Sequence, residues 1–319
     1  MFEVVKNFFV FQFLWGELSV SGTDYYTYSP AAFRLVGTSA DSIVAGAPSS
    51  RPGFYNYTES FDFPSEMQLT WKSYAQVNQD ETVVKILGEG NNTGGFFVDL
   101  ASNHWKRLSN TLLLEVTYKW QGICVEPNLE YRDELLKYRR CRVVTSPVSS
   151  QSNENVLFRL DGVVGGIVEG EMDNNPGEKG RGGEDVDEVT LATVTLSVLL
   201  NNLNAPHIID YMSLDVEGAE YYVLKHHDFG RHHFKILSIE RPIERLHKLL
   251  TSHNYHWLAM LGDFGDCMYI HYTIPNFNKI MHEYAPNRLS TLWESRPFAP
   301  KSNHDYMINS YKIINHEYV

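Results

Sequence analysis

The chain has 319 residues, 43% of them hydrophobic and 13% aromatic, which is enough for one large globular domain or two small ones. Its net charge of −12 argues against a nucleic-acid partner, because binding to a phosphate backbone needs clustered lysine and arginine side chains. The sequence also contains no stretch that approaches the ~20 consecutive apolar residues of a membrane-spanning helix.

Residues 1–72 are predicted to form an N-terminal extension. From residue 23 to about residue 74 loops are expected to dominate, since Ser, Tyr, Gly and Pro are frequent and no period is sustained. The extension contains an apolar run at 8–15, followed by small residues at 19–22. Either a signal segment or a strand or helix packed on the surface would give this pattern. Sequons at Asn56 and Asn91 are compatible with secretion but occur often by chance. Localisation therefore stays open between the cytoplasm and the secretory pathway.

From residue 73 onward the hydrophobic pattern predicts alternating helices and strands. A helix is expected over 79–87, where apolar residues recur on one face. A first strand then ends at Asp99 and a second strand ends at Glu126. The helix expected between these strands has an apolar stripe made of Leu108, Leu112, Leu113 and Val116.

The alternation continues through the rest of the domain. The expected elements are a helix over 131–140, a strand over 141–145, a helical pattern over 190–203, a strand over 208–215, a helix over 217–226 and a strand over 235–240. Two further strands, over 255–260 and 267–272, are close enough to require an antiparallel hairpin. The acidic segment near 169–188 is predicted to be a mobile insertion, and residues 274–319 form a C-terminal tail without a clear assignment.

This order of elements predicts an α/β fold over residues 73–273. We expect a Rossmann-like, doubly wound sheet that is mostly parallel and ends in a C-terminal antiparallel hairpin. In such sheets ligands bind at the carboxyl ends of the strands.

The three cysteines do not form a CxxC motif and cannot all pair with each other. We therefore expect reduced, structural thiols. The exception to consider is Cys124 with Cys141, because both fall near the starts of two strands that would be neighbours. The third cysteine is Cys267.

Acidic residues stand at the ends of the predicted parallel strands, namely Asp99, Glu126, Asp215 and Glu240. A carboxylate at the tip of the second strand suits the two hydroxyl groups of a ribose. Asp215 is the candidate general base, and Glu217 is the second predicted catalytic residue. Capping of the following helix is the alternative for each acid, and the spacing of Glu217 and Glu220 suggests that one of them caps.

Several motifs resemble the FkbM-type methyltransferases, which are class I, S-adenosylmethionine-dependent O-methyltransferases. The matching segments are Gly95-Phe-Phe-Val-Asp-Leu-Ala-Ser-Asn103, Ser109-Asn-Thr111, Glu126-Pro-Asn128 and Leu214-Asp-Val-Glu-Gly-Ala-Glu220. The resemblance covers about residues 73–273. It implies S-adenosyl-L-methionine as cofactor and a hydroxyl group of a small molecule, sugar or glycoconjugate as the methyl acceptor.

The resemblance also implies roles for individual residues. Asp99 and Asn103 would line the methionine end of the cofactor, and Glu126 would accept the ribose hydroxyls. Asn128 would lie beside the adenosine, and Asp215 between the sulfonium and the acceptor hydroxyl. The other implied cofactor-binding residues are Gln79, Ala101 and Asn110.

One loop departs from the family pattern Asp-x-Gly-Ala-Asn-x-Gly, because Ala101 and Trp105 stand where the glycines would be. Glycine at such positions permits a positive φ and close approach of the backbone. Ala101 adds only a methyl group, whereas Trp105 predicts that the loop turns differently.

Other functions remain open from the residues alone. Asp215 and Glu217 imitate the acidic pair of a metal-dependent glycosyltransferase, and the altered loop would also suit a non-catalytic scaffold. Paired histidines at 226–227 and 232–233 invite a metal hypothesis, but a helix C-terminus favours histidine by itself. No metal site is predicted, although a divalent ion on Asp215 and its neighbours could lower the pKa of a sugar hydroxyl. The sequence does not indicate an oligomeric state.

Overall fold

The computed structural model describes residues 73–88, 93–177, 179–180, 183–262 and 264–284, together with the backbone of four N-terminal strands. Three of these strands form an antiparallel sheet, consisting of β1 (Glu17–Val20), β2 (Asp24–Ser29) and β3 (Ala32–Gly37). The expectation that loops dominate from residue 23 is therefore wrong for β2 and β3. Tyrosine and threonine favour strands, so the tyrosine-rich composition of β2 fits this outcome. The apolar run at 8–15 and both sequons lie outside the described residues.

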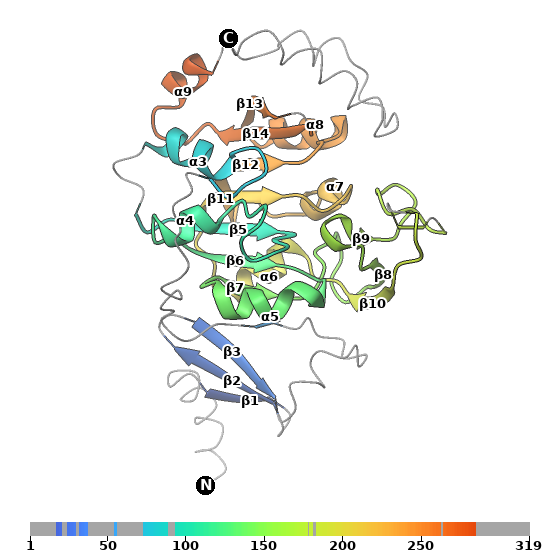
Figure 1. Ribbon diagram of the computed structural model, residues 1–319. Helices are drawn as coiled ribbons and strands as arrows, with labels where there is room; N and C mark the ends of the chain where they lie inside the picture. Colours follow the sequence, from blue (N-terminus) through green and yellow to red (C-terminus); the bar gives the residue numbers. More distant parts are fainter. Residues whose placement is uncertain are drawn as a thin grey trace.

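The main domain is built on one twisted sheet (Figure 1). Its strand order is β13 (Tyr255–Leu261), β14 (Asp266–His271), β12 (His233–Ile239), β11 (Ile208–Leu214), β5 (Phe96–Leu100), β6 (Gln121–Val125), β7 (Arg142–Val144) and β4 (Phe54–Tyr55). The strands from β12 to β7 are parallel, whereas β13, β14 and β4 pair in antiparallel fashion with their neighbours. The predicted Rossmann-like, mostly parallel sheet with a C-terminal hairpin is confirmed.

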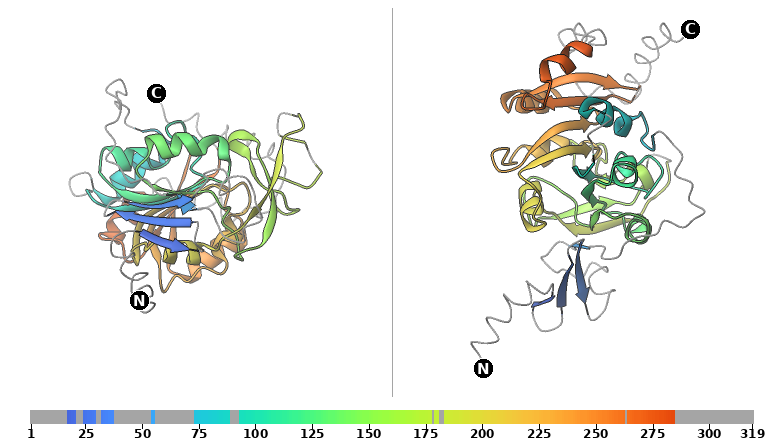
Figure 2. Two further views of the ribbon diagram at one scale, coloured as in Figure 1. Left: turned by 90° about the horizontal axis from the view of Figure 1, so that it is seen from below. Right: turned by 90° about the vertical axis from the view of Figure 1, so that its left-hand side faces the viewer.

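Helices cover both faces of this sheet (Figure 2). One face packs against α3 (Gln79–Leu87), α4 (Leu112–Val116), α5 (Leu129–Tyr138) and α9 (Phe277–Glu283). The opposite face packs against α6 (Leu196–Asn202), α7 (Glu220–Leu224) and α8 (Glu244–Ser252). Burial on both faces explains why β5 is buried at every position. The chain leaves β5 toward one edge of the sheet and returns at β11 toward the other, so the switch point lies between these two strands.

Three helical predictions need correction. Leu108 lies outside α4, with φ at 61° and an exposed side chain, so the apolar stripe begins only at Leu112. The helix expected from residue 217 begins at Glu220, because Glu217 and Gly218 both have a positive φ and form a turn. Residues 190–192, expected to be helical, belong to a strand that precedes α6.

That strand belongs to a small antiparallel sheet with the order β10 (Glu188–Ala192), β8 (Asn155–Arg159) and β9 (Gly166–Ile167). We call residues 155–192 the inserted module; it lies beside the main sheet, on the right in Figure 1. The module has an apolar cluster of its own, which includes Phe158, Ile167 and Met172 and also Ala219 of the main domain. The predicted insertion near 169–188 is part of this module, and its mobility stays a prediction.

A disulfide joins Cys124 and Cys141, whose Cα atoms lie 5.8 Å apart. The expectation of reduced thiols is wrong for this pair and confirmed for Cys267, which is buried and unpaired with other cysteines. Cys124 lies on β6 opposite Val143 of β7, two residues beyond Cys141. The two-residue period of a strand places both cysteines on the same face, where they share one apolar cluster.

Candidate active site

A pocket lies at the carboxyl ends of β5, β6 and β11, next to the switch point of the sheet. It has a volume of about 560 Å³, which includes space open to solvent. The floor is made by the residues that follow the three strands, and one wall is made by residues of the inserted module. The predicted site residues that line it are Ala101, Asn103, Glu126, Asn128, Asp215 and Glu217.

The loop after β5 keeps a glycine-like conformation although it lacks the glycines. Ala101 has φ at 62° and Asn103 has φ at 57°, both in the left-handed region. For an alanine this conformation costs about 1 kcal/mol, a cost that the surrounding fold must offset. Trp105 does not line the pocket; its ring packs against Tyr138, with 4.5 Å between the ring centroids. The pocket therefore stays clear of the tryptophan.

Glu126 is buried and joins the tips of β5 and β6. Its Oε2 accepts a hydrogen bond of 2.7 Å from the amide N–H of Asn103, and its Oε1 accepts one of 2.8 Å from the amide of Asn128. Burial raises the pKa of Glu126 to about 7, against the lowering effect of these two amides. The carboxylate is thus held in place while it faces the pocket, and its oxygens can accept further hydrogen bonds.

Two asparagines carry buried polar atoms without a protein partner. Asn128 caps α5, because its Oδ1 accepts from the amide of Glu130 at 3.1 Å, but its Nδ2 has no hydrogen-bond partner among the described residues. Asn110 donates from Nδ2 to Ser213 Oγ at 2.8 Å, while its Oδ1 also finds no partner in the described part of the chain. Buried polar groups are normally satisfied, so Nδ2 of Asn128, which lines the pocket, is suited to an acceptor group of a ligand, whereas Asn110 does not line the pocket.

Asp99 takes a different position from the one that its strand-end placement suggested. Its carboxylate is buried on the face that carries α4 and α5, where it accepts a 2.5 Å hydrogen bond from Thr111 Oγ1. Burial raises its pKa, and the charge of Arg139 lowers it. Arg139 itself is fully buried and pairs with Glu115. Asp99 does not line the pocket, and its contact with a cofactor stays a prediction.

The acidic residues after β11 and β12 form one cluster. Oxygens of Asp215, Glu217 and Glu240 lie within 4.8 Å of one another. Burial and the negative charges of Glu240 and Glu217 raise the pKa of Asp215 well above its usual range. Arg241 donates from Nη2 to Glu240 at 2.6 Å and to Glu217 at 3.1 Å. These three carboxylates form the single candidate cation site among the described residues, and an arginine already supplies positive charge to two of them.

Glu220 and Gln79 lie around this cluster. Glu220 Oε1 accepts hydrogen bonds from the amides of Val216 and Gly218, so this residue caps the turn before α7. Burial raises the pKa of Glu220 to about 8. Gln79 donates from Nε2 to Asp266 Oδ1 at 2.9 Å and does not line the pocket. Its predicted contact with a cofactor stays a prediction.

One histidine of each pair, His227 and His232, is engaged in local hydrogen bonds. His227 Nε2 lies 2.8 Å from the carbonyl oxygen of His232, and the ring of His232 bonds to Pro206 O and Asn201 Oδ1. His104, which follows Asn103 in the loop after β5, accepts at Nδ1 from the amides of Lys106 and Arg107. These imidazoles therefore have local structural partners.

Sequence reasoning missed Arg241, although it directly follows Glu240 at the end of a strand. Its contacts reach residues that are far away along the chain. Only the position after a strand end could have marked it as part of the site, and that signal does not identify its partners.

A doubly wound sheet with a C-terminal hairpin and a pocket at its switch point is consistent with the class I methyltransferase fold. The profile of the FkbM methyltransferase domain matches residues 75–265, which is more than half of the chain. The chain therefore belongs to the FkbM methyltransferase domain family and is a methyltransferase. This membership disfavours the glycosyltransferase and the non-catalytic scaffold.

No curated protein and no solved structure matches the chain significantly. Among the described helices, none has the length and apolar character needed to cross a membrane.

Proposed function

We propose that the protein transfers the methyl group of S-adenosyl-L-methionine to a hydroxyl group, with a sugar or glycoconjugate as the acceptor. The observation that carries this proposal is the pairing of Glu126 with Asn128 in the pocket. Glu126 offers oxygen acceptors, and Asn128 Nδ2 is a buried donor without a partner among the residues described. An adenosine provides both hydroxyl donors and ring-nitrogen acceptors, so it fits this pair.

The cofactor would lie across the switch point of the sheet. Glu126 would accept from the ribose hydroxyls, and Asn128 would lie beside the adenosine. The left-handed loop with Ala101 and Asn103 lets the backbone pass close to the ligand. Asn110 Oδ1, a buried acceptor, would suit the ammonium group at the methionine end of the cofactor. We also assign Gln79 and Asp99 to that end.

Asp215 is the proposed general base. When bound, S-adenosyl-L-methionine supplies an already activated methyl group, so the protein mainly aligns the acceptor and receives its proton. A carboxylate with a raised pKa is a stronger base than an ordinary aspartate. Burial and the neighbouring charges of Glu240 and Glu217 provide this shift. Glu217, held by Arg241, would orient the acceptor through its carboxylate.

The assignment of a sugar-like acceptor rests on family analogy. The acidic cluster of Asp215, Glu217 and Glu240 supports it, because neighbouring carboxylates can bind several hydroxyl groups of one sugar. Residues of the inserted module form a wall of the same pocket, including Phe158 and Val163. We assign contact with the acceptor to this wall.

Isothermal titration calorimetry with S-adenosylhomocysteine tests the cofactor proposal. We expect micromolar affinity for the native chain and a loss of at least about tenfold for Glu126→Ala, because the ribose acceptor is removed. Glu130→Ala is the matched control, since this residue is a neighbouring acid on α5 that does not line the pocket. Absence of binding, or equal affinity in native protein and Glu126→Ala, would contradict the proposal.

A further inference from the structure

Arg241 connects the acidic cluster to the inserted module. Besides Glu240 and Glu217, its Nη2 approaches Asp173 Oδ2 of the module at 2.5 Å. One guanidinium therefore binds acids from three separate places, namely the end of β12, the turn after β11 and the module. Most of this side chain is buried, which strengthens such ion pairs relative to exposed ones.

The backbone conformation of Arg241 indicates that surrounding contacts hold this residue in place. Arg241 has φ at 42°, in the left-handed region that a residue with a side chain rarely adopts. Such a conformation costs about 1–3 kcal/mol and persists only when surrounding contacts hold it. Here the amide of Arg241 donates to the carbonyl of Gly265, and its side chain makes the three ionic contacts.

The module and the turn after β11 also meet through their backbones. The amide of Asp173 donates to the carbonyl of Glu217 at 3.0 Å. A Cβ on Gly218 would lie 2.9 Å from the amide nitrogen of Asp173, and a Cβ on Gly166 would lie 3.2 Å from Glu217 Cβ. Gly218 thus lets the backbone of the module approach closely.

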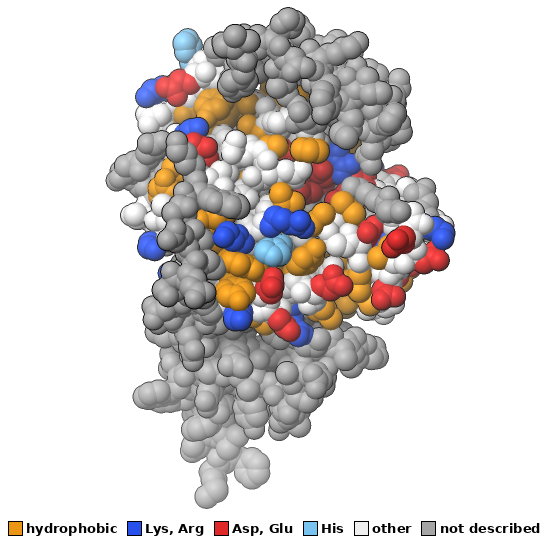
Figure 3. All heavy atoms as spheres, viewed as in Figure 1, with side chains coloured by type: hydrophobic (Ala, Val, Ile, Leu, Met, Phe, Trp, Pro, Cys, Tyr) orange, Lys and Arg blue, Asp and Glu red, His pale blue; other side chains and the backbone are white. Residues whose placement is uncertain are grey.

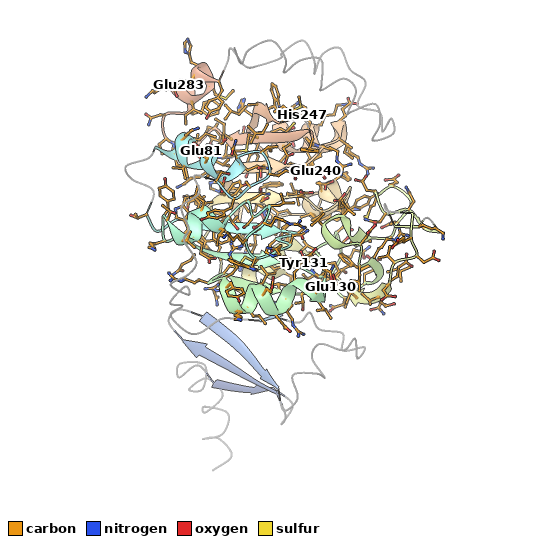
Figure 4. All side chains as sticks on the ribbon, in the orientation of Figure 1. Glu81, Glu130, Tyr131, Glu240, His247 and Glu283 are labelled. Carbon is orange, nitrogen blue, oxygen red and sulfur yellow. A yellow bond between two sulfur atoms is a disulfide. The ribbon has the colours of Figure 1, made fainter. Side chains whose placement is uncertain are left out.

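We propose that Arg241 is a positioning residue that fastens the inserted module over the pocket and supplies a permanent positive charge to the acidic cluster. The consequence for methyl transfer rests on the function proposed above, whereas the fastening itself does not. Figure 4 labels Glu240 at the end of β12, next to which this contact forms. Figure 3 shows acidic side chains grouped beside basic ones on the face that includes the module.

The charge also explains how so many acids can lie together. The titratable groups that act on Asp215 are Glu217, Glu240 and Asp266. Arg241 pairs with Glu217, Glu240 and Asp173, and its charge also acts on Glu220 and Asp266. Without the arginine, the remaining acids would repel one another more strongly and would bind protons at higher pH. The general base would then be protonated, and inactive, over more of the neutral range.

Hydrogen exchange on the full chain without ligand tests the fastening. In Arg241→Met we expect the amides of residues 166–174 to exchange about tenfold faster or more, while those of β5 and β6 keep their rates. Arg241→Lys, which retains one charge but lacks the branched guanidinium, should fall between native protein and Arg241→Met. Asp173→Asn should accelerate exchange in the same segment.

The matched control is Arg245→Met. Arg245 pairs with Glu171 of the same module, but both side chains are largely exposed, so its removal should leave exchange at 166–174 within about twofold. Equal exchange in native protein, Arg241→Met and Asp173→Asn would overturn the fastening. An acceleration of exchange at residues 166–174 in Arg245→Met as large as that in Arg241→Met would also overturn it. The effect would then not be specific to the contact of Arg241 with the module.

Carbon-13 NMR of the carboxyl groups tests the role of the charge. In Arg241→Met the carboxyl group of the cluster that titrates at the highest pH should titrate about one pH unit higher or more. In Arg241→Lys its titration midpoint should return most of the way to the native value. An unchanged titration would overturn this role. If the native chain fails to bind S-adenosylhomocysteine, the methyl-transfer proposal fails, and these two measurements still decide whether Arg241 acts as stated.

Discussion

The two ends of the parallel sheet bury different titratable groups, acids at the carboxyl end and histidines at the amino end. At the carboxyl end, burial raises the pKa of the acids, to about 7 for Glu126 and about 6 for Asp266. At the amino end, burial lowers the pKa of His227 and His271 to about 4, so these imidazoles are neutral. Both ends therefore disfavour charge. Glu126 at the carboxyl end lines the pocket at the switch point, whereas a second pocket at the amino end is lined by Asp210 and Lys235 but not by His227 or His271.

His227 and the two asparagines of the site differ in their hydrogen-bond partners, although His233 Nε2 at the amino end also lacks a partner among the described residues. His227 bonds through Nδ1 to Ser197 Oγ and through Nε2 to the carbonyl of His232, so both ring nitrogens are satisfied. Asn110 and Asn128 at the other end each keep a buried polar atom without a partner in the described part of the chain. A buried titratable group alone is thus a weak sign of a site, and a neighbouring unsatisfied atom makes it stronger.

The largest effect at the carboxyl end is expected on turnover, from Asp215→Asn. The substitution removes the proposed base but keeps the shape of the side chain, so turnover should fall by about 10²–10⁴-fold. Affinity for S-adenosylhomocysteine should stay within about tenfold, because the role of Asp215 lies in the transition state. Methyl transfer from labelled cofactor to a panel of glycans measures turnover. A variant with full turnover would remove Asp215 from the mechanism.

The next effect concerns stability at the amino end. Folded His227 has a depressed pKa, so the unfolded chain binds the proton first as pH falls from about 6.5 to about 4. The native chain should therefore lose up to about 3 kcal/mol of unfolding free energy through this group over that range. Urea unfolding at several pH values measures the loss.

His227→Gln should reduce that loss, whereas His226→Gln should not, because His226 is an exposed neighbour. The neutral-histidine account would be wrong if native protein and His227→Gln showed the same dependence of stability on pH.

The smallest effect is expected in the pH dependence of cofactor affinity. Glu126 should be protonated increasingly as pH falls below about 7, and a neutral carboxyl group is a poorer acceptor for ribose hydroxyls. Affinity for S-adenosylhomocysteine should therefore fall by several-fold, on the order of 3–10-fold, between pH 8 and pH 5.5. Glu126→Gln should bind more weakly and lose this dependence; an equally steep dependence in that variant would assign it to another group.

The sequence predicted the elements that place Glu126, Asn128 and Asp215. The reason is physical: the carboxyl ends of parallel strands meet at one edge of a sheet, so strand-end residues converge. The same argument does not bring Asp99 to the pocket, because Asp99 is inside β5 and shares the face of Phe97, since side chains alternate along a strand. Residues 97 and 99 are two apart on one strand, so assigning Phe97 to the helix-covered face would also have assigned Asp99 to that face.

Other features depend on contacts between distant residues. Arg241 and Asp173 belong to different elements, and neither hydrophobic period nor turn residues indicate that they meet. The left-handed conformation of Leu108 likewise follows from tertiary packing. Local patterns carry no signal of such contacts. The disulfide of Cys124 with Cys141 differs, because their positions near the starts of neighbouring strands marked them as a candidate pair.

The most direct test of the account is a crystal structure of the full chain with S-adenosylhomocysteine. We predict the ribose hydroxyls within hydrogen-bond distance of the Glu126 carboxylate and the adenosine against Asn128, with its Nδ2 satisfied. A ligand bound elsewhere on the molecule, with Asn128 Nδ2 still lacking a partner, would contradict the account.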